Sequence, residues 1–499
     1  MRLRLVLAAA ASSLAFTSAA RAAVPVGWSV APPIDGGTSS IGASVASSGN
    51  VAAVGAPFAT LTSGGTPAGA VLVYANSGSG WTSQQVSAPS PIDGGNFGTS
   101  VAMSGSLLAV GAAGTPPAAY VFGADGGSYQ LQQAWADPPA DTNGSFGGSV
   151  AVYAGPGGAN YVAVAAPPGS SNPAGAVYVS RQLPGGAWSN PPETITNASF
   201  AAFGISVAFA GNGDLLVGDP GTGGGQVLVY TPQPGGWAQN GTLPAALDGG
   251  TLSQFGNGIA ASNDLVVVTA PGSADTGKTY NGAAFVFSAS DAGVWTQQAV
   301  LTGSAPESFG NFAPAIQGGL LAVGSAINTA SSGAGQVDVW ALDKGAWVPV
   351  PAAGLKGDSY YGQAVGIAGD AIFIGDTSAL GAASIDEVTS ALFVATAIYA
   401  DAGAGADAGT GDAGGGDGAV PGVDGSTPGV DGSSPVSNPD AASGGDGSAE
   451  PVGSSGGSGG GCSCMAAGDG GGGELAFFVE GMIPFLAWGL RRRMARRRA

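Results

Sequence analysis

The residue types that support common forms of enzyme catalysis are scarce in this sequence. The chain contains no histidine, and its two cysteines, Cys462 and Cys464, lie near the C-terminus. Ser-His-Asp and Cys-His mechanisms and histidine-ligated zinc are therefore excluded, and two cysteines cannot complete a four-ligand zinc site. The glycine-rich stretch 221–225 lacks the Lys-Ser/Thr ending of a phosphate-binding loop.

Carboxylates are the remaining catalytic candidates. Paired acidic side chains hydrolyse glycosidic bonds, and Asp219, Asp338 and Asp376 could converge if their segments meet in one ring. Asp219 and Asp376 occupy equivalent positions of a repeated unit, and repetition explains them better than catalysis does. We therefore predict no catalytic, cofactor-binding or metal-binding residue, and keep a carboxylate-dependent glycan hydrolase as an alternative function.

The elements that would position any such side chains come from one unit that recurs seven times. In 97–122 an aromatic residue and a glycine precede a small-residue strand, a tight turn and an apolar run that ends in Gly-Ala. A variable loop, a second apolar run and a Gly with an aromatic residue follow. The copies begin at Ile41, Phe97, Phe146, Phe203, Phe255, Phe309 and Tyr361. Their spacing of 49 to 57 residues indicates a solenoid, a propeller or an array.

The apolar runs of the unit have the composition of β-strands. They are short, rich in β-branched and aromatic residues and bounded by Gly, Pro, Asn or Asp, as in 71–74, 177–179, 227–230 and 337–340. They are nearly continuous, which predicts that both faces of each strand are buried. About four such strands per unit make one blade of a sheet, and a closed ring of blades supplies neighbours for both faces. We therefore predict an all-β fold, a seven-bladed β-propeller.

The two ends of the array support ring closure. Six copies finish with a Gly and an aromatic residue, whereas the seventh has none after 391–394, and one such pair, Gly27-Trp28, precedes the first copy. The simplest interpretation is that the N-terminal strand completes the last blade. The alternative is a divergent last blade, with the N-terminal strand paired elsewhere.

These units resemble FG-GAP repeats, the blades of integrin α-subunit-type propellers. Phe97-Gly98 and Phe203-Gly204 match the FG, 55–57 matches the GAP, and other copies drift from it. The resemblance covers about residues 27–399 and implies a surface binding or adhesion module more often than an enzyme. Calcium-binding relatives carry closely spaced acidic ligands in hairpin loops. The long loops here offer only isolated acids, so we expect no such calcium site.

The charge of the repeat region limits its partners. Residues 23–399 contain four basic and 20 acidic residues, a formal net charge of −16. Nucleic acid is excluded as an expected partner, because phosphate binding needs basic clusters. Acidity of this kind more often favours solubility than it marks a cation site, and we expect a monomer.

The segments on either side of the repeats predict export and a spacer. Residues 1–22 combine Arg2 and Arg4 with a short apolar stretch and a small-x-small cleavage site, as in a signal peptide; a buried N-terminal helix is the alternative. Residues 400–461 consist mainly of Asp, Ala, Gly, Ser and Pro, which predicts a disordered, acidic linker. A calcium-binding repeat is the alternative there, although the apolar strand positions are missing.

The C-terminal segment, 462–499, has three parts. Cys462 and Cys464 come first, a short apolar stretch at 475–490 predicts a marginal membrane helix, and an arginine cluster follows. The cluster consists of Arg491, Arg492, Arg493, Arg496, Arg497 and Arg498. This order resembles the MYXO-CTERM sorting signal of myxobacterial surface proteins, which implies cleavage near a cysteine and surface anchoring through a lipid on that cysteine. A Cys462–Cys464 disulfide or free thiols are the alternative.

Together these features predict an exported protein at the cell surface or outer membrane, held near its C-terminus. Its expected function is non-enzymatic binding of a protein or glycan ligand, without a cofactor. The alternatives are the glycan hydrolase named above and a structural envelope protein with no discrete ligand.

Overall fold

The computed structural model describes the repeat region of the chain. The described residues are 24–31, 34–35, 40–60, 67–78, 80–138, 145–168, 175–190, 192–197, 202–221, 224–246, 253–273, 282–290, 293–303, 309–312, 314–326, 335–351, 355–357, 360–377 and 390–399. The predicted signal peptide, linker and C-terminal sorting signal, with the predicted helix, lie outside them. Among the described residues there is no apolar helix of the length that a membrane crossing needs.

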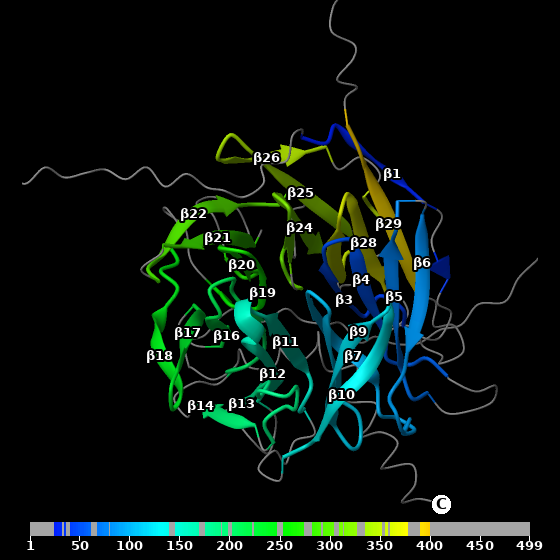
Figure 1. The fold of residues 1–499 in the computed structure, drawn as a ribbon. Helices are drawn as coiled ribbons and strands as arrows, with labels where there is room; N and C mark the ends of the chain where they lie inside the picture. Colours follow the sequence, from blue (N-terminus) through cyan, green and yellow to red (C-terminus); the bar gives the residue numbers. More distant parts are fainter. Residues whose placement is uncertain are drawn as a thin grey trace, which may run out of the picture. The chain divides into compact units, whose positions relative to one another are not determined.

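The described strands form seven antiparallel sheets, which are the blades (Figure 1). Blade 1 contains β3 (Ser44–Ser48), β4 (Val51–Ala56), β5 (Ala70–Asn76) and β6 (Trp81–Val86). Blade 2 contains β7 (Phe97–Ser104), β8 (Leu107–Ala112), β9 (Ala118–Asp125) and β10 (Ser128–Ala136). Blade 3 contains β11 (Ser149–Ala154), β12 (Asn160–Ala166), β13 (Ala176–Arg181) and β14 (Glu193–Thr196). Blade 4 contains β15 (Val207–Phe209), β16 (Leu215–Asp219), β17 (Gln226–Gln233) and β18 (Gly236–Thr242).

The remaining three blades repeat this order. Blade 5 contains β19 (Gly258–Ser262), β20 (Leu265–Ala270), β21 (Ala283–Ala289) and β22 (Trp295–Leu301). Blade 6 contains β23 (Ala315–Gln317), β24 (Leu320–Ser325), β25 (Gln336–Asp343) and β26 (Ala346–Val350). Blade 7 contains β27 (Ala364–Ala368), β28 (Ala371–Asp376) and β29 (Ala391–Ile398), followed in space by β1 (Gly27–Val30), while β2 (Ile34–Asp35) also pairs with β29. The seven-bladed, all-β fold predicted from the repeats is confirmed.

The hydrophobic core is divided among the junctions between neighbouring blades. Each of seven apolar clusters combines residues of two adjacent blades, including one that joins blade 7 to blade 1. The leading residue of each copy is buried at such a junction, with at most 3% of its surface exposed. Because each blade covers its neighbour on both sides, the chain closes into a ring, as the nearly continuous apolar strands predicted.

The N-terminal strand closes that ring. β1 pairs with β29 antiparallel, with Trp28 opposite Ala397 and Val30 opposite Ala395. Trp28 is 7% exposed and packs in the cluster between blades 6 and 7. Figure 1 shows β1 in dark blue beside the gold β29. The predicted completion of the last blade by Gly27-Trp28 is therefore confirmed.

The repeated glycines explain how neighbouring blades approach so closely. The glycine after each leading residue has a positive φ, as at Gly98 (φ 94°) and Gly256 (φ 98°), a conformation that other residues rarely adopt. The first glycine of the GAP sequence packs against this glycine of the next blade: a Cβ at Gly55 would overlap the Gly98 carbonyl oxygen. Gly375 of blade 7 meets Gly42 of blade 1 in the same way. The FG and GAP sequences are thus two halves of one junction between blades.

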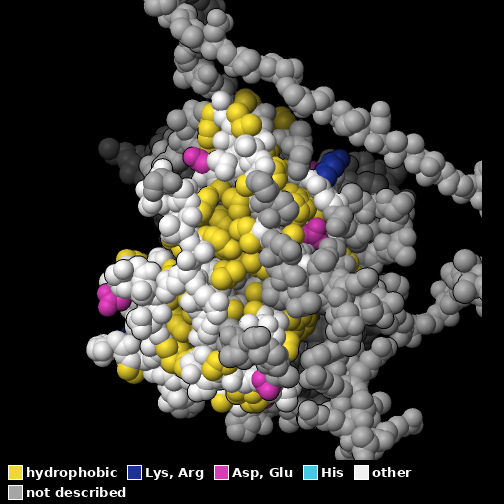
Figure 2. Space-filling model, turned by 90° about the vertical axis from the view of Figure 1, so that its right-hand side faces the viewer, with side chains coloured by type: hydrophobic (Ala, Val, Ile, Leu, Met, Phe, Trp, Pro, Cys, Tyr) yellow, Lys and Arg dark blue, Asp and Glu magenta, His cyan; other side chains and the backbone are white. Residues whose placement is uncertain are grey.

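The outer surface carries few charges. The last strand of a blade is mostly exposed or half-buried, as in β10, where only Trp135 is buried, and its exposed side chains are mostly Gln, Thr and Ser. Figure 2 shows one face on which hydrophobic and uncharged groups dominate and the charged side chains are isolated. The prediction that both strand faces are buried therefore holds for the inner strands, and the outermost strands depart from it.

Candidate binding site at the central channel

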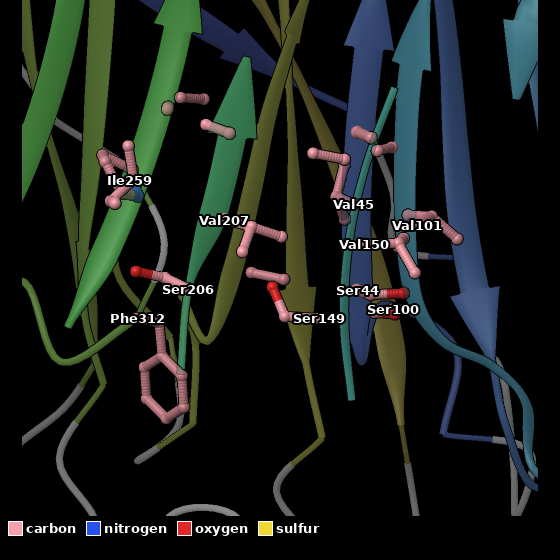
Figure 3. A pocket seen from close by; sticks show the side chains of 18 of the residues that line it. Ser44, Val45, Ser100, Val101, Ser149, Val150, Ser206, Val207, Ile259 and Phe312 are labelled. Carbon is pink, nitrogen blue, oxygen red and sulfur yellow. The ribbon is translucent and has the colours of Figure 1, made fainter. Parts of the chain in front are cut away.

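The first strands of all seven blades surround a central cavity of about 610 Å³ (Figure 3). Each of these strands, β3, β7, β11, β15, β19, β23 and β27, is the inner edge of its sheet. The volume lies within the range of about 300–1,000 Å³ that is typical of small-molecule sites. The cavity is the candidate site because every blade contributes to it.

Equivalent positions of the repeat form layers along the channel. Counted from the leading residue, the fourth position is serine in blades 1 to 4: Ser44, Ser100, Ser149 and Ser206. The fifth position carries β-branched side chains in six blades: Val45, Val101, Val150, Val207, Ile259 and Val365. Figure 3 shows the labelled serines at one level, the labelled valines above them and Phe312 below. We call the serine and Phe312 end the polar mouth; it comprises the third and fourth positions of the repeat.

Three of the mouth serines also hold blades together. The Oγ of Ser44 donates to the carbonyl oxygen of Gly98 over 2.8 Å, a bond between blades 1 and 2. Ser100 donates in the same way to Gly147 (2.8 Å), and Ser206 donates to Gly256 (2.7 Å). Each hydroxyl has one hydrogen, so these serines can only accept hydrogen bonds from a ligand.

Blades 5 to 7 interrupt this regular layer. The fourth position is Gly258 in blade 5 and Ala364 in blade 7. In blade 6 one extra residue precedes β23, so Phe312 lies just before the equivalent position. The third position carries an amide in the same blades: Asn257, Asn311 and Gln363. Asn257, Asn311, Phe312, Ala364 and Gln363 all line the cavity. The mouth is therefore asymmetric although the fold repeats.

Two of these amides are held by hydrogen bonds. Asn257 Nδ2 donates to the carbonyl oxygen of Asn311 over 2.7 Å. The hydroxyl of Thr377 donates to Oε1 of Gln363, and both side chains are buried. Gln363 therefore keeps its N–H donors for other partners, and Asn257 keeps its carbonyl oxygen as an acceptor.

Charged groups do not take part in this site. The described residues that line the cavity include no Asp, Glu, Lys or Arg. The lining consists of Ser, Thr, Asn, Gln and apolar residues, so the groups that meet a ligand have no charge near neutral pH. In the described part of the chain there is also no group of three acidic or cysteine side chains that could hold a metal ion.

The three carboxylates considered from the sequence lie in different blades. Asp219 ends β16, is fully buried, and accepts hydrogen bonds from the Ala202 N–H (3.0 Å) and from Gln226 Nε2 (3.1 Å) of its own blade. Asp338 lies in β25, and Asp376 ends β28. None of the three lines the cavity, so the structure does not show the convergence that a paired-carboxylate mechanism requires.

The aromatic residues at the start of blade 7 have different environments. Tyr361 is 1% exposed and packs edge-on against Phe393, with ring centroids 4.9 Å apart. Burial, and secondly the negative charge of Asp376, raise the pKa of Tyr361 far above its usual value. Burial also raises the pKa of Tyr360. Tyr361 therefore packs between blades 6 and 7.

Sequence reasoning did not identify the polar mouth. Its members, Phe312 above all, are departures from the repeat, and a comparison of the seven fourth positions would have found them. The site residues that were predicted, Cys462, Cys464 and the arginines at 491–493 and 496–498, lie outside the described residues and stay predictions.

Comparison with known proteins supports the repeat assignment. Residues 237–287 match the FG-GAP repeat family model. This span runs from the last strand of blade 4 to the third strand of blade 5 and contains Phe255-Gly256. A search of curated proteins finds no match.

Several solved structures are similar over much of the chain. A chain of the mitotic checkpoint complex is 12% identical, with a TM-score of 0.42, and the match covers 80% of this chain and all of that one. Sqt1 of Chaetomium thermophilum is 13% identical, with a TM-score of 0.42 and coverage of 76% and 99%. Sqt1 of Saccharomyces cerevisiae is 12% identical, with a TM-score of 0.41 and coverage of 71% and 83%.

Proposed function

We propose that this FG-GAP repeat propeller is a non-enzymatic binding module that takes a protein or glycan ligand at the polar mouth of its channel. The observation that carries the proposal is the asymmetry of the mouth. Four blades present serine at one position, and blades 5 to 7 replace it while adding amides beside it. Ring packing alone favours the same residue in each blade, and we attribute the loss of this regularity at the mouth to a ligand.

The chemistry of the mouth suits binding better than catalysis. General acid–base catalysis needs titratable groups within hydrogen-bond reach of the reacting atoms. The described lining offers hydroxyls, amides, aliphatic groups and the rings of Phe209 and Phe312 instead. Such groups orient a ligand in a concave pocket without changing it chemically.

The predicted flanking segments support a proposed location of this module at the cell surface. A signal peptide at 1–22 would direct export, and the acidic segment 400–461 would separate the propeller from an anchor at Cys462 or Cys464. The fold of an FG-GAP propeller is compatible with adhesion. We therefore propose that the protein displays its channel outward from the envelope to a ligand in the surroundings.

The test is capture by the full-length chain of surface proteins and polysaccharides extracted from the producing cells. The decisive variant is Phe312→Ser, which removes the aromatic ring from the mouth and leaves a small hydroxyl side chain. The matched control is Leu131→Ser, because Leu131 is 41% exposed on the outer strand β10. We expect specific capture by the wild type and by Leu131→Ser, and its loss in Phe312→Ser. If no variant captures any ligand, the structural envelope role replaces the proposal.

A further inference from the structure

The departures from the repeat gather in one arc of the polar mouth. Gly258, Phe312 and Ala364 come from consecutive blades, and the amides of Asn257 and Gln363 precede the first and the last of them. The opposite arc keeps its serines, three of which are committed to bonds between blades. The mouth thus has one arc of hydrogen-bonding amides with an aromatic ring and one arc of hydroxyl acceptors.

We propose that this mouth binds the end of an uncharged saccharide, a ligand class that rests on the proposed binding function. A pyranose ring presents apolar C–H groups on one face and hydroxyls around its edge. Each of its hydroxyls can donate and accept a hydrogen bond. An aromatic ring with donors and acceptors around it is complementary to that distribution.

The hydrogen-bonding groups of the mouth are fixed before a ligand arrives. The Thr377 hydroxyl holds Gln363 Oε1, so Gln363 offers N–H donors. The bond from Asn257 to the carbonyl oxygen of Asn311 leaves the Asn257 carbonyl oxygen as an acceptor. A donor and an acceptor in fixed orientation match neighbouring hydroxyls, and pre-organisation lowers the entropic cost of binding.

The absence of charge in the described lining selects against other ligands of this size. A phosphate or carboxylate group that enters the channel would lose water without gaining a basic partner, which is costly. A cation would likewise find no acidic partner there. A wholly apolar ligand would leave the amides without hydrogen bonds, and that penalty is paid for each buried group.

The depth of the channel limits how far a saccharide enters. Above the serine layer the channel wall is apolar. It is lined there by the β-branched side chains Val45, Val101, Val150 and Val207 (Figure 3). These apolar groups cannot replace the water around sugar hydroxyls. The inference is therefore that a terminal sugar unit occupies the mouth and that the rest of the chain extends outward.

A glycan array tests this ligand class. Full-length protein is applied to immobilised oligosaccharides that end in neutral hexoses or N-acetylhexosamines, and to matched oligosaccharides that end in uronic or sialic acids. We expect retention on neutral ends. Titration of the retained neutral oligosaccharide should show about a tenfold weaker Kd for Phe312→Ser, equivalent to about 1.4 kcal/mol, and an unchanged Kd for Leu131→Ser.

Folding of the variants is checked by their melting temperatures, and Phe312→Ser is expected to fold because Phe312 is only half-buried and belongs to none of the seven apolar clusters. Retention only on acidic ends, equal binding by Phe312→Ser, or no retention at all would overturn the inference. If Phe312→Ser loses capture of a surface protein while neutral oligosaccharides do not bind, the binding function stands and the saccharide inference fails. If both capture and glycan binding are absent in the wild type, both proposals fail.

Discussion

Replacing Gly55 by alanine should destabilise the propeller at the junction between blades 1 and 2. Gly55 is buried, and an added Cβ would lie well inside the 3.0 Å that real Cβ atoms keep from the Gly98 carbonyl oxygen and from Ser44 Oγ. Two rigid blades must then separate. The same movement stretches the hydrogen bond from Ser44 to Gly98, which is 2.8 Å long.

The expected cost follows from these two effects. Overpacking of a core costs about 1–3 kcal/mol, and loss of a typical hydrogen bond adds about 1 kcal/mol. The unfolding entropy is about 2.1 cal/mol/K per residue, or about 0.8 kcal/mol/K for a domain of this size. A destabilisation of about 2–4 kcal/mol therefore lowers the melting temperature by about 3–5 °C.

Thermal unfolding followed by circular dichroism measures this shift, and Gly235→Ala is the matched control. Gly235 is exposed, has no positive φ, and has no neighbouring atom within 4 Å of the Cβ position. The control should melt at or slightly above the wild-type temperature, because alanine restricts the unfolded chain. If Gly55→Ala melts with the control, the close glycine contact does not hold the blades together.

Four further predictions concern stability, metals and processing. Tyr361→Phe should stabilise the protein by about 1 kcal/mol, because the Tyr361 hydroxyl is buried without a hydrogen-bond partner in the described structure. The raised pKa keeps Tyr361 protonated in the folded protein, whereas in the unfolded chain the tyrosine ionises near pH 10. The free energy of unfolding should therefore fall as the pH rises above about 10, and it should fall less steeply in Tyr361→Phe. Parallel urea titrations at about pH 8 and 11 check both the stabilisation and its pH dependence. Deletion of residues 24–31 should lower the free energy of unfolding by at least about 3–5 kcal/mol, the usual cost of losing a buried tryptophan side chain. Equal melting temperatures for the deleted and the intact protein would contradict ring closure by β1. A calcium chelator should leave the melting temperature unchanged, and a drop of several degrees would reveal a bound ion. Mass spectrometry of the envelope fraction should find a chain that ends near Cys462, whereas a peptide reaching Arg498 would indicate an uncleaved tail.

The fold could be predicted because the same residues meet the same surroundings in every blade. Phe97 and its equivalents are buried at successive junctions, so their recurrence marks the blades. The unpaired aromatic position of the last copy and the surplus Trp28 together predicted the closing strand. Repetition can be recognised in the sequence alone, without any distance from the structure.

The polar mouth could not be predicted in the same way. The bond from Ser44 to Gly98 joins residues of different copies, and no spacing rule within one copy reveals it. The orientation of Gln363 depends on a hydrogen bond from Thr377, which directly follows β28 and is 14 residues further along the chain. The carboxylates Asp219 and Asp376 drew attention by residue type, although their places in the blades keep them out of the channel.

A repeated ring places a limit on where a binding site can form. Residues that recur in each blade are largely committed to its junctions, and a ligand site must therefore use positions that differ. Loss of the serine in blade 5 removes one bond between blades, and Asn257 compensates because its amide bonds to Asn311 of blade 6. Asn257 thus supports both the junction and the mouth, so its substitution would alter stability and binding together. Phe312 makes no such bond in the described structure, and its replacement separates the two roles.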